Sequence, residues 1–67
     1  MQSANDNTPL MSPKEAASKT TLSRPLLALM SEAGEFPKSV KISVRRVAYV
    51  RAEVESWIDQ RIAQRAA

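Results

Sequence analysis

The segment from Thr20 to Tyr49 constrains the fold of this chain more than any other part of the sequence. Ser23 is placed to cap a helix that runs from Arg24 to Ala33, and Gly34 stands where a helix commonly ends. Pro37 cannot continue the helix and pushes the residue before it into an extended conformation. The segment therefore predicts a short helix, an abrupt stop and a change of structure behind it.

A two-stranded β-hairpin is predicted behind the stop. Apolar and polar residues alternate from Ser39 to Ser43, and a second β-rich run follows from Arg46 to Val50. Only Val44 and Arg45 separate the two runs, so the tip of the hairpin is expected there. Three cations lie on these runs and at the tip: Lys41, Arg45 and Arg46.

Two further helices are predicted, one before and one after this segment. Ser12 can cap the first helix, Pro13 suits its first position, and Glu15 completes a capping box; the helix is expected to end near Lys19. The last helix is expected from Arg51 to about Arg65, with acidic residues near its start and basic residues near its end, as the helix dipole favours.

These elements predict an α+β fold, a small winged helix-turn-helix with three helices and a two-stranded β-hairpin wing. Residues 12–67 are expected to form this one domain, because a chain of 67 residues is too short for two. Residues 1–11 are polar and show no periodicity, so they are predicted to be a disordered N-terminal arm.

Apolar spacing assigns the core and the exposed surface. One face of the second helix is expected to be buried, and its members are Leu26, Leu29, Met30 and Ala33, with Leu22 just ahead. The opposite, exposed arc carries Arg24, Ala28 and Ser31, with Leu27 and Glu32 at its edges. Phe36 is expected beneath the turn, and the last helix is expected to pack through Val54, Trp57, Ile58 and Ile62.

The composition argues against an enzyme. The sequence has no histidine and no cysteine, which removes the usual zinc ligands, a histidine general base and disulfides. We predict no metal and no cofactor. The longest apolar run, Leu26 to Met30, is too short to span a bilayer, and no export signal follows Met1, so a cytoplasmic protein is expected.

The charge balance favours an anionic partner. Ten Lys and Arg against seven Asp and Glu give a formal net charge of +3 at pH 7. Cations on a hairpin also protect an exposed edge from aggregation. However, three cations on so short a hairpin exceed what edge protection needs, so contact with DNA is the favoured interpretation.

The sequence resembles the AlpA-type prophage regulators and the related excisionases of the MerR-like winged-helix group. The resemblance covers about residues 12–65, and its anchors are Leu22-Ser23-Arg24, Gly34-Glu35-Phe36-Pro37, Val40-Lys41-Ile42, Arg45, Val47, Tyr49 and Glu53-Val54-Glu55-Ser56-Trp57-Ile58. It implies a second helix in the major groove of DNA and a wing that reaches the adjacent minor groove. It also implies a transcription regulator, an excisionase (recombination directionality factor) that promotes excision of an integrated mobile element, or both.

The sequence departs from this family in two places that concern DNA. The second helix holds Ala28, Leu29, Glu32 and Ala33 where relatives carry more polar and basic residues, so base-edge hydrogen bonding is expected to be sparse. Ser43 and Val44 stand where relatives usually have two glycines at the wing tip. With few residues that read bases, one copy should bind weakly, which favours several copies on adjacent sites.

The predicted partners are double-stranded DNA, an integrase or recombinase, and further copies of the chain assembled head to tail; no membrane partner is expected. The predicted DNA-binding residues are Ser23, Arg24, Leu27, Ala28, Ser31, Lys38, Lys41, Arg45 and Arg46. Two alternatives stay open. One is a transcriptional activator or repressor without a recombination role, and the other is an adaptor that binds a protein instead of DNA through Leu27, Ala28 and Leu29.

Overall fold

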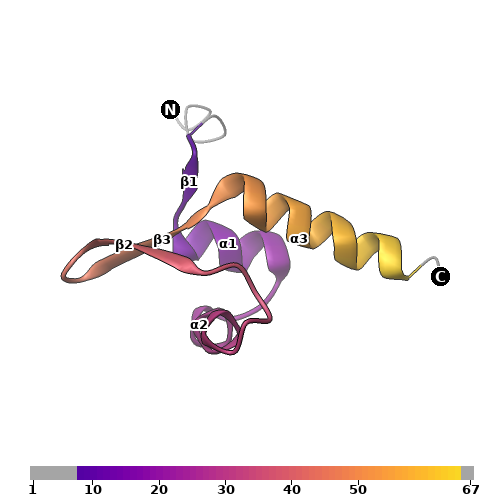
Figure 1. Cartoon of the computed structure of the whole chain (residues 1–67), viewed down its shortest axis with the longest axis horizontal. Coiled ribbons are helices and arrows are strands. Elements are labelled where there is room, and N and C mark those ends of the chain that lie inside the picture. Colours follow the sequence, from indigo (N-terminus) through magenta and orange to yellow (C-terminus); the bar gives the residue numbers. More distant parts are fainter. Residues whose placement is uncertain (1–7, 66–67) are drawn as a thin grey trace.

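The computed structural model describes residues 8–65 and confirms the predicted α+β winged-helix architecture. The elements are β1 (Leu10–Met11), α1 (Pro13–Thr20), α2 (Arg24–Glu32), β2 (Ser39–Ser43), β3 (Arg46–Val50) and α3 (Arg51–Gln64). The β2–β3 hairpin projects from one side of the helices and α3 extends to the other, while α2 lies below the sheet (Figure 1). No linker separates β3 from α3, since Val50 ends the strand and Arg51 begins the helix.

The helix ends follow from local chemistry, as the sequence predicted. The hydroxyl of Ser12 accepts a hydrogen bond from the Glu15 amide at 3.0 Å, and the hydroxyl of Ser23 accepts one from the Leu26 amide at 3.2 Å. Each bond satisfies an amide that has no partner inside the helix. Gly34 follows α2 with a φ of 84°, a left-handed conformation that costs glycine nothing.

The sheet has three antiparallel strands in the order β1-β3-β2, so the hairpin is joined by a strand that the sequence did not reveal. Leu10 pairs with Val50 and Met11 pairs with Tyr49, and the Met11 side chain is completely buried. The predicted disordered arm, residues 1–11, therefore extended too far along the chain. Residues 8–11 belong to the fold, and residues 1–7 lie outside the described residues.

Arg51 fastens this N-terminal strand to the rest of the domain. Its guanidinium forms a bidentate ion pair with Glu15, with nitrogen–oxygen distances of 2.8 and 3.1 Å. The same guanidinium donates to the backbone carbonyls of Thr8 at 2.8 Å and Leu10 at 3.3 Å. The Glu15 carboxylate is thus bound to Arg51, and among the described residues it makes no capping-box bond back to Ser12.

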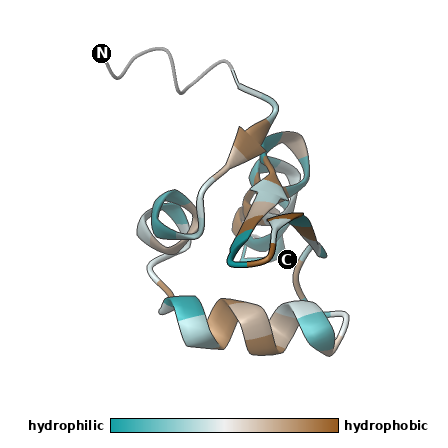
Figure 2. Cartoon of the chain, turned by 90° about the vertical axis from the view of Figure 1, so that its left-hand side faces the viewer, coloured by the Kyte–Doolittle hydropathy of each residue, from teal (hydrophilic) through white to brown (hydrophobic). Residues whose placement is uncertain are grey.

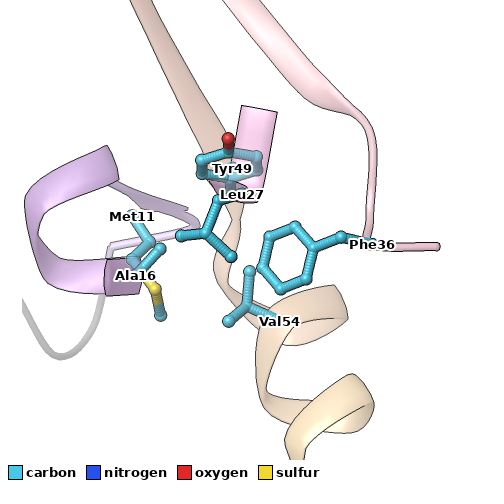
Figure 3. Close-up of a cluster of buried hydrophobic side chains, with 6 residues drawn as sticks. All are labelled: Met11, Ala16, Leu27, Phe36, Tyr49 and Val54. Atoms are coloured by element: carbon cyan, nitrogen blue, oxygen red, sulfur yellow. The ribbon is translucent and has the colours of Figure 1, made fainter. Parts of the chain in front are cut away.

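The core lies where β1, β3 and the three helices meet (Figure 3). Its buried members are Met11, Ala16, Leu27, Phe36, Tyr49 and Val54, and five half-buried residues pack against them: Ala17, Leu22, Met30, Trp57 and Ile58. The Phe36 ring packs edge-on against Tyr49 and Trp57, with ring centroids 5.3 and 5.0 Å apart. The expectation that Phe36 fills the space beneath the turn is confirmed.

Trp57 connects α3 to the segment that follows α2. Its indole nitrogen donates a hydrogen bond to the Glu35 carbonyl at 2.9 Å, and the Arg61 guanidinium lies 4.7 Å from the centre of its ring. The indole is half-buried, so one part of the ring packs in the core while another remains accessible. Ile62, one turn further along α3, is largely exposed, so its predicted place in the core was wrong.

The buried face of α2 differs from the predicted one. Leu27 is completely buried and Ser31 is only 4% exposed, whereas Leu26 and Leu29 are 40% and 67% exposed. The Ser31 hydroxyl donates to the Pro37 carbonyl at 3.0 Å, which satisfies it inside the fold. The helix is rotated so that Leu27, Met30 and Ser31, at spacings of three and four residues, face the core. The predictions that Leu26, Leu29 and Ala33 are buried and that Leu27 and Ser31 are exposed were therefore wrong.

Candidate nucleic-acid interface

The hairpin and the residue that leads into it carry unpaired positive charge. Between Glu35 and Glu53 the chain has no acidic residue. Four cations in this stretch are exposed, namely Lys38, Lys41, Arg45 and Arg46. In the part of the chain that the structure describes, none of the four lies within ion-pair distance of a carboxylate. Their charge is available to an external anion.

Strand pairing determines which side of the hairpin each cation occupies. Lys41 pairs with Val47, and Ser39 pairs with Tyr49, so these two pairs lie on the same face of the sheet. Tyr49 on that face is buried in the core, where loss of hydration raises the pKa of its phenol. Lys41 therefore extends from the face that turns toward the helices, whereas alternation along β3 puts Arg46 on the other face.

The tip of the hairpin is built without glycine. The register shifts by one residue between Lys41 and Ser43, which makes a β-bulge in β2. Neither Val44 nor Arg45 has a positive φ, although the favoured two-residue hairpin turns require one. The bulge adds local twist that accommodates such a tip. Val44 is 89% exposed and Arg45 is exposed beside it, so both protrude from the end of the wing.

The N-terminus of α2 supplies the second part of the surface. Arg24 is the first residue of the helix and is exposed, and Ser23 precedes it as the capping residue. The first turn contains no acidic residue, so the positive end of the helix dipole is not neutralised there. Pro25 has no amide hydrogen, and the Leu26 and Leu27 amides are bound to Ser23, so this end offers a phosphate mainly the helix dipole and the Arg24 side chain.

A groove runs between α2 and the base of the hairpin. Its walls are Ala28, Ser31, Glu32, Lys38, Ser39, Val47 and Tyr49. In Figure 2, α2 lies across the lower part of the molecule and the hairpin points toward the viewer above it. A helix and a basic hairpin that border one open groove can contact neighbouring grooves of a duplex from one side of the protein.

The family of the chain is decided by a comparison with protein-family models. Residues 10–62 match the model described as prophage CP4-57 regulatory protein (AlpA). The chain belongs to the AlpA family. No curated protein and no solved structure matches it significantly. AlpA membership indicates a small DNA-binding regulatory protein in a prophage context, which agrees with the basic surface described above.

For this AlpA-family chain, the structure separates the predicted DNA-binding residues into two groups. Seven are exposed around the hairpin, the groove and the start of α2: Ser23, Arg24, Ala28, Lys38, Lys41, Arg45 and Arg46. Leu27 and Ser31 are buried, and the Ser31 hydroxyl is bound to the Pro37 carbonyl, so neither offers a surface to DNA in this fold.

Arg51 shows why counting cations in an AlpA-family sequence overstates the binding surface. It follows the hairpin directly, yet its guanidinium is buried and paired with Glu15. The bond to Arg51 is the main reason that the pKa of the Glu15 carboxyl is lowered. The capping signal at Ser12 and Glu15 had concealed this pairing, because the sequence offers no local sign of a partner 36 residues away.

Two further findings concern other kinds of site in the AlpA-family chain. Residues 8–65 contain no cluster of three or more acidic residues, histidines or cysteines that could hold a metal ion. No helix in that range is long and apolar enough to cross a membrane.

Proposed function

We propose that this chain binds duplex DNA with α2 in the major groove and the β2–β3 hairpin at the adjacent minor groove. The observation that carries the proposal is the set of four exposed cations between Lys38 and Arg46 that have no acidic partner in the described structure. Phosphate contacts of this kind determine affinity, whereas base contacts determine the choice of sequence.

Each part of the surface has a separate task in this proposal. Lys38, Lys41 and Arg46 bind phosphates, and Arg45 at the tip enters the narrow minor groove, where the negative potential is strongest and where its charge also neutralises phosphate. Arg24 at the start of α2 contacts a base edge, because arginine pairs bidentately with guanine. The Ser23 hydroxyl oxygen already accepts a hydrogen bond from the Leu26 amide, and its O–H group can donate to a phosphate oxygen.

The biological role that we propose is that of a recombination directionality factor, which promotes excision of an integrated element and also regulates transcription. Support comes from the AlpA-family match and from the resemblance of the anchor blocks to excisionases of the winged-helix group. The proposed partners are an integrase and further copies of the chain on adjacent sites. Several copies would supply the specificity that one short, mostly apolar α2 lacks.

A gel-shift titration against bulk duplex DNA at low salt tests DNA binding directly. The proposal expects a shift at micromolar protein or below. A protein adaptor, which the exposed Leu29 would also suit, should shift no DNA at that concentration. An excision assay with the integrase of the same element then tests the recombination role. If removal of this protein abolishes promoter control and leaves excision unchanged, only the role in transcription regulation remains.

A further inference from the structure

The outward side of α2 is mostly apolar. Leu29 is 67% exposed, Leu26 is 40% exposed, and Ala28 and Ala33 are also exposed. Figure 2 shows the middle of this helix as hydrophobic and its two ends as hydrophilic. Exposed leucine on a helix that has a fully satisfied buried face is not needed for folding, so this surface points to a contact with another molecule.

The charges around this apolar surface indicate what that molecule is. Arg24 stands at one end of α2, and Lys38 lies across the groove from Ala28. Neither cation has an acidic partner among the described residues. A purely apolar partner that covered Leu29 would leave these cations without counter-charges. A DNA major groove instead offers apolar groups on its floor and phosphates along both edges.

The apolar group on the floor of the major groove is the C5-methyl of thymine. We propose that α2 reads thymine through this methyl group, with Leu29 and Ala28 as the residues that contact it. The inference rests on the proposed DNA-binding function and adds a base preference to it. Helix geometry supports the choice of residues, since Leu29 lies opposite Leu27 and Ser31, which face the core, and Ala28 lies to the side of them on the wall of the groove.

Adjacent A·T pairs are the ligand that follows from this surface. Hydrogen-bonding readers are scarce along α2, because its only charged residues are Arg24 at its first position and Glu32 at its last. An apolar centre between two charged ends favours a site whose middle carries thymine methyls. A guanine contact by Arg24 would then lie at one edge of the site.

Substitution of deoxyuridine for thymidine removes the methyl group and leaves Watson–Crick pairing in place. The best binding site is first selected from random duplexes, and its thymines are then replaced by uracils. Burial of one methyl group corresponds to about a fourfold change in affinity, and of two to about 16-fold. We expect the uracil duplex to bind about 4- to 16-fold more weakly than the thymine duplex.

Leu29→Ser tests the residue, and Ile62→Ser is its matched control on α3, where the side chain is also exposed. Leu29→Ser should lower the thymine-to-uracil ratio of affinities by about fourfold, the share of one methyl contact, whereas Ile62→Ser should keep the parent ratio. Both variants should melt like the parent, since neither side chain is buried.

The outcomes separate this inference from the function on which it rests. If the parent binds both duplexes equally, thymine reading is overturned while DNA binding stands. If the parent prefers thymine and Leu29→Ser keeps the parent ratio, the assignment of Leu29 as the reader is overturned. If the parent binds no duplex at all, the proposed function fails first.

Discussion

Removal of the two wing arginines tests the electrostatic basis of the proposed interface. The change is Arg45→Ala combined with Arg46→Ala, at and beside the tip of the β2–β3 hairpin. Both residues are exposed, and neither forms an ion pair in the described structure. Their loss should therefore leave the fold intact and weaken binding to all DNA sequences.

The size of the effect follows from counterion release. Each phosphate that a cation neutralises contributes about −0.9 to the slope of log affinity against log salt. If Lys38, Lys41, Arg45 and Arg46 each neutralise one phosphate, the parent slope is about −3.6 and the double variant has about −1.8. Between 50 and 200 mM salt, the parent then loses affinity by about 150-fold and the variant by about 12-fold.

A gel-shift or anisotropy titration at four salt concentrations measures these slopes. The control is Arg61→Ala with Arg65→Ala, which removes the same charge from the last turn of α3 and its C-cap and should keep a slope close to that of the parent. In Figure 1 the end of α3 lies on the opposite side of the molecule from the hairpin. A double wing variant with the parent slope would refute the assignment of the wing to DNA.

Three further predictions concern specificity and stability. Arg24→Ala should lose preference for the selected site more than total affinity, and competition with random DNA that gives the parent ratio would exclude Arg24 as a base reader. Trp57→Ala should lower the free energy of unfolding by about 3 kcal/mol, because the packing on Phe36 is lost. Trp57→Phe loses the hydrogen bond to the Glu35 carbonyl and should lower it by only about 1 kcal/mol. A thermal melt of Trp57→Ala close to that of the parent would contradict the structural role of Trp57. Because the folded-state pKa of Glu15 is lowered, its ion pair should stabilise the fold above the ordinary carboxyl pKa and lose that effect as pH falls through the folded-state value. Glu15→Gln should therefore melt below the parent at neutral pH, and a gap that does not narrow on acidification would oppose this account.

Much of the fold could be predicted because local chemistry determines it. Ser12 and Ser23 cap their helices by bonds to an amide three residues away, and Gly34 adopts the left-handed conformation that its position required. The alternating pattern and the short gap at Val44 and Arg45 likewise predicted the hairpin. Each of these signals lies within a few residues of the structure that it predicts.

The buried face of α2 could not be predicted in the same way. Leu26 to Met30 are five apolar residues in succession, so their spacing favours no side of the helix strongly. The rotation depends on contacts from outside the helix, among them the packing of Leu27 in the core and the hydrogen bond between Ser31 and the Pro37 carbonyl. The candidate site changed with it, since Leu27 moved into the core and Leu29 to the surface.

The N-terminal strand was missed for a related reason. Leu10 and Met11 are too few to show alternation, and the strand exists because β3 offers it a partner edge. The ion pair between Glu15 and Arg51 joins residues 36 positions apart, and no motif in the sequence announces it. From the sequence alone, where this ion pair cannot be seen, Arg51 resembles one more cation that could bind DNA.

The direct passage from β3 into α3 has a consequence for the entropy that is lost when the protein binds DNA. Arg51, the first residue after the strand, is held by Glu15 and by two backbone carbonyls, so the β3 side of the hairpin root is fastened to the domain. The wing is therefore held in its orientation before it contacts a duplex, and little conformational entropy remains at this root to be lost on association. Loosening this root should lower affinity even in a variant that retains every cation.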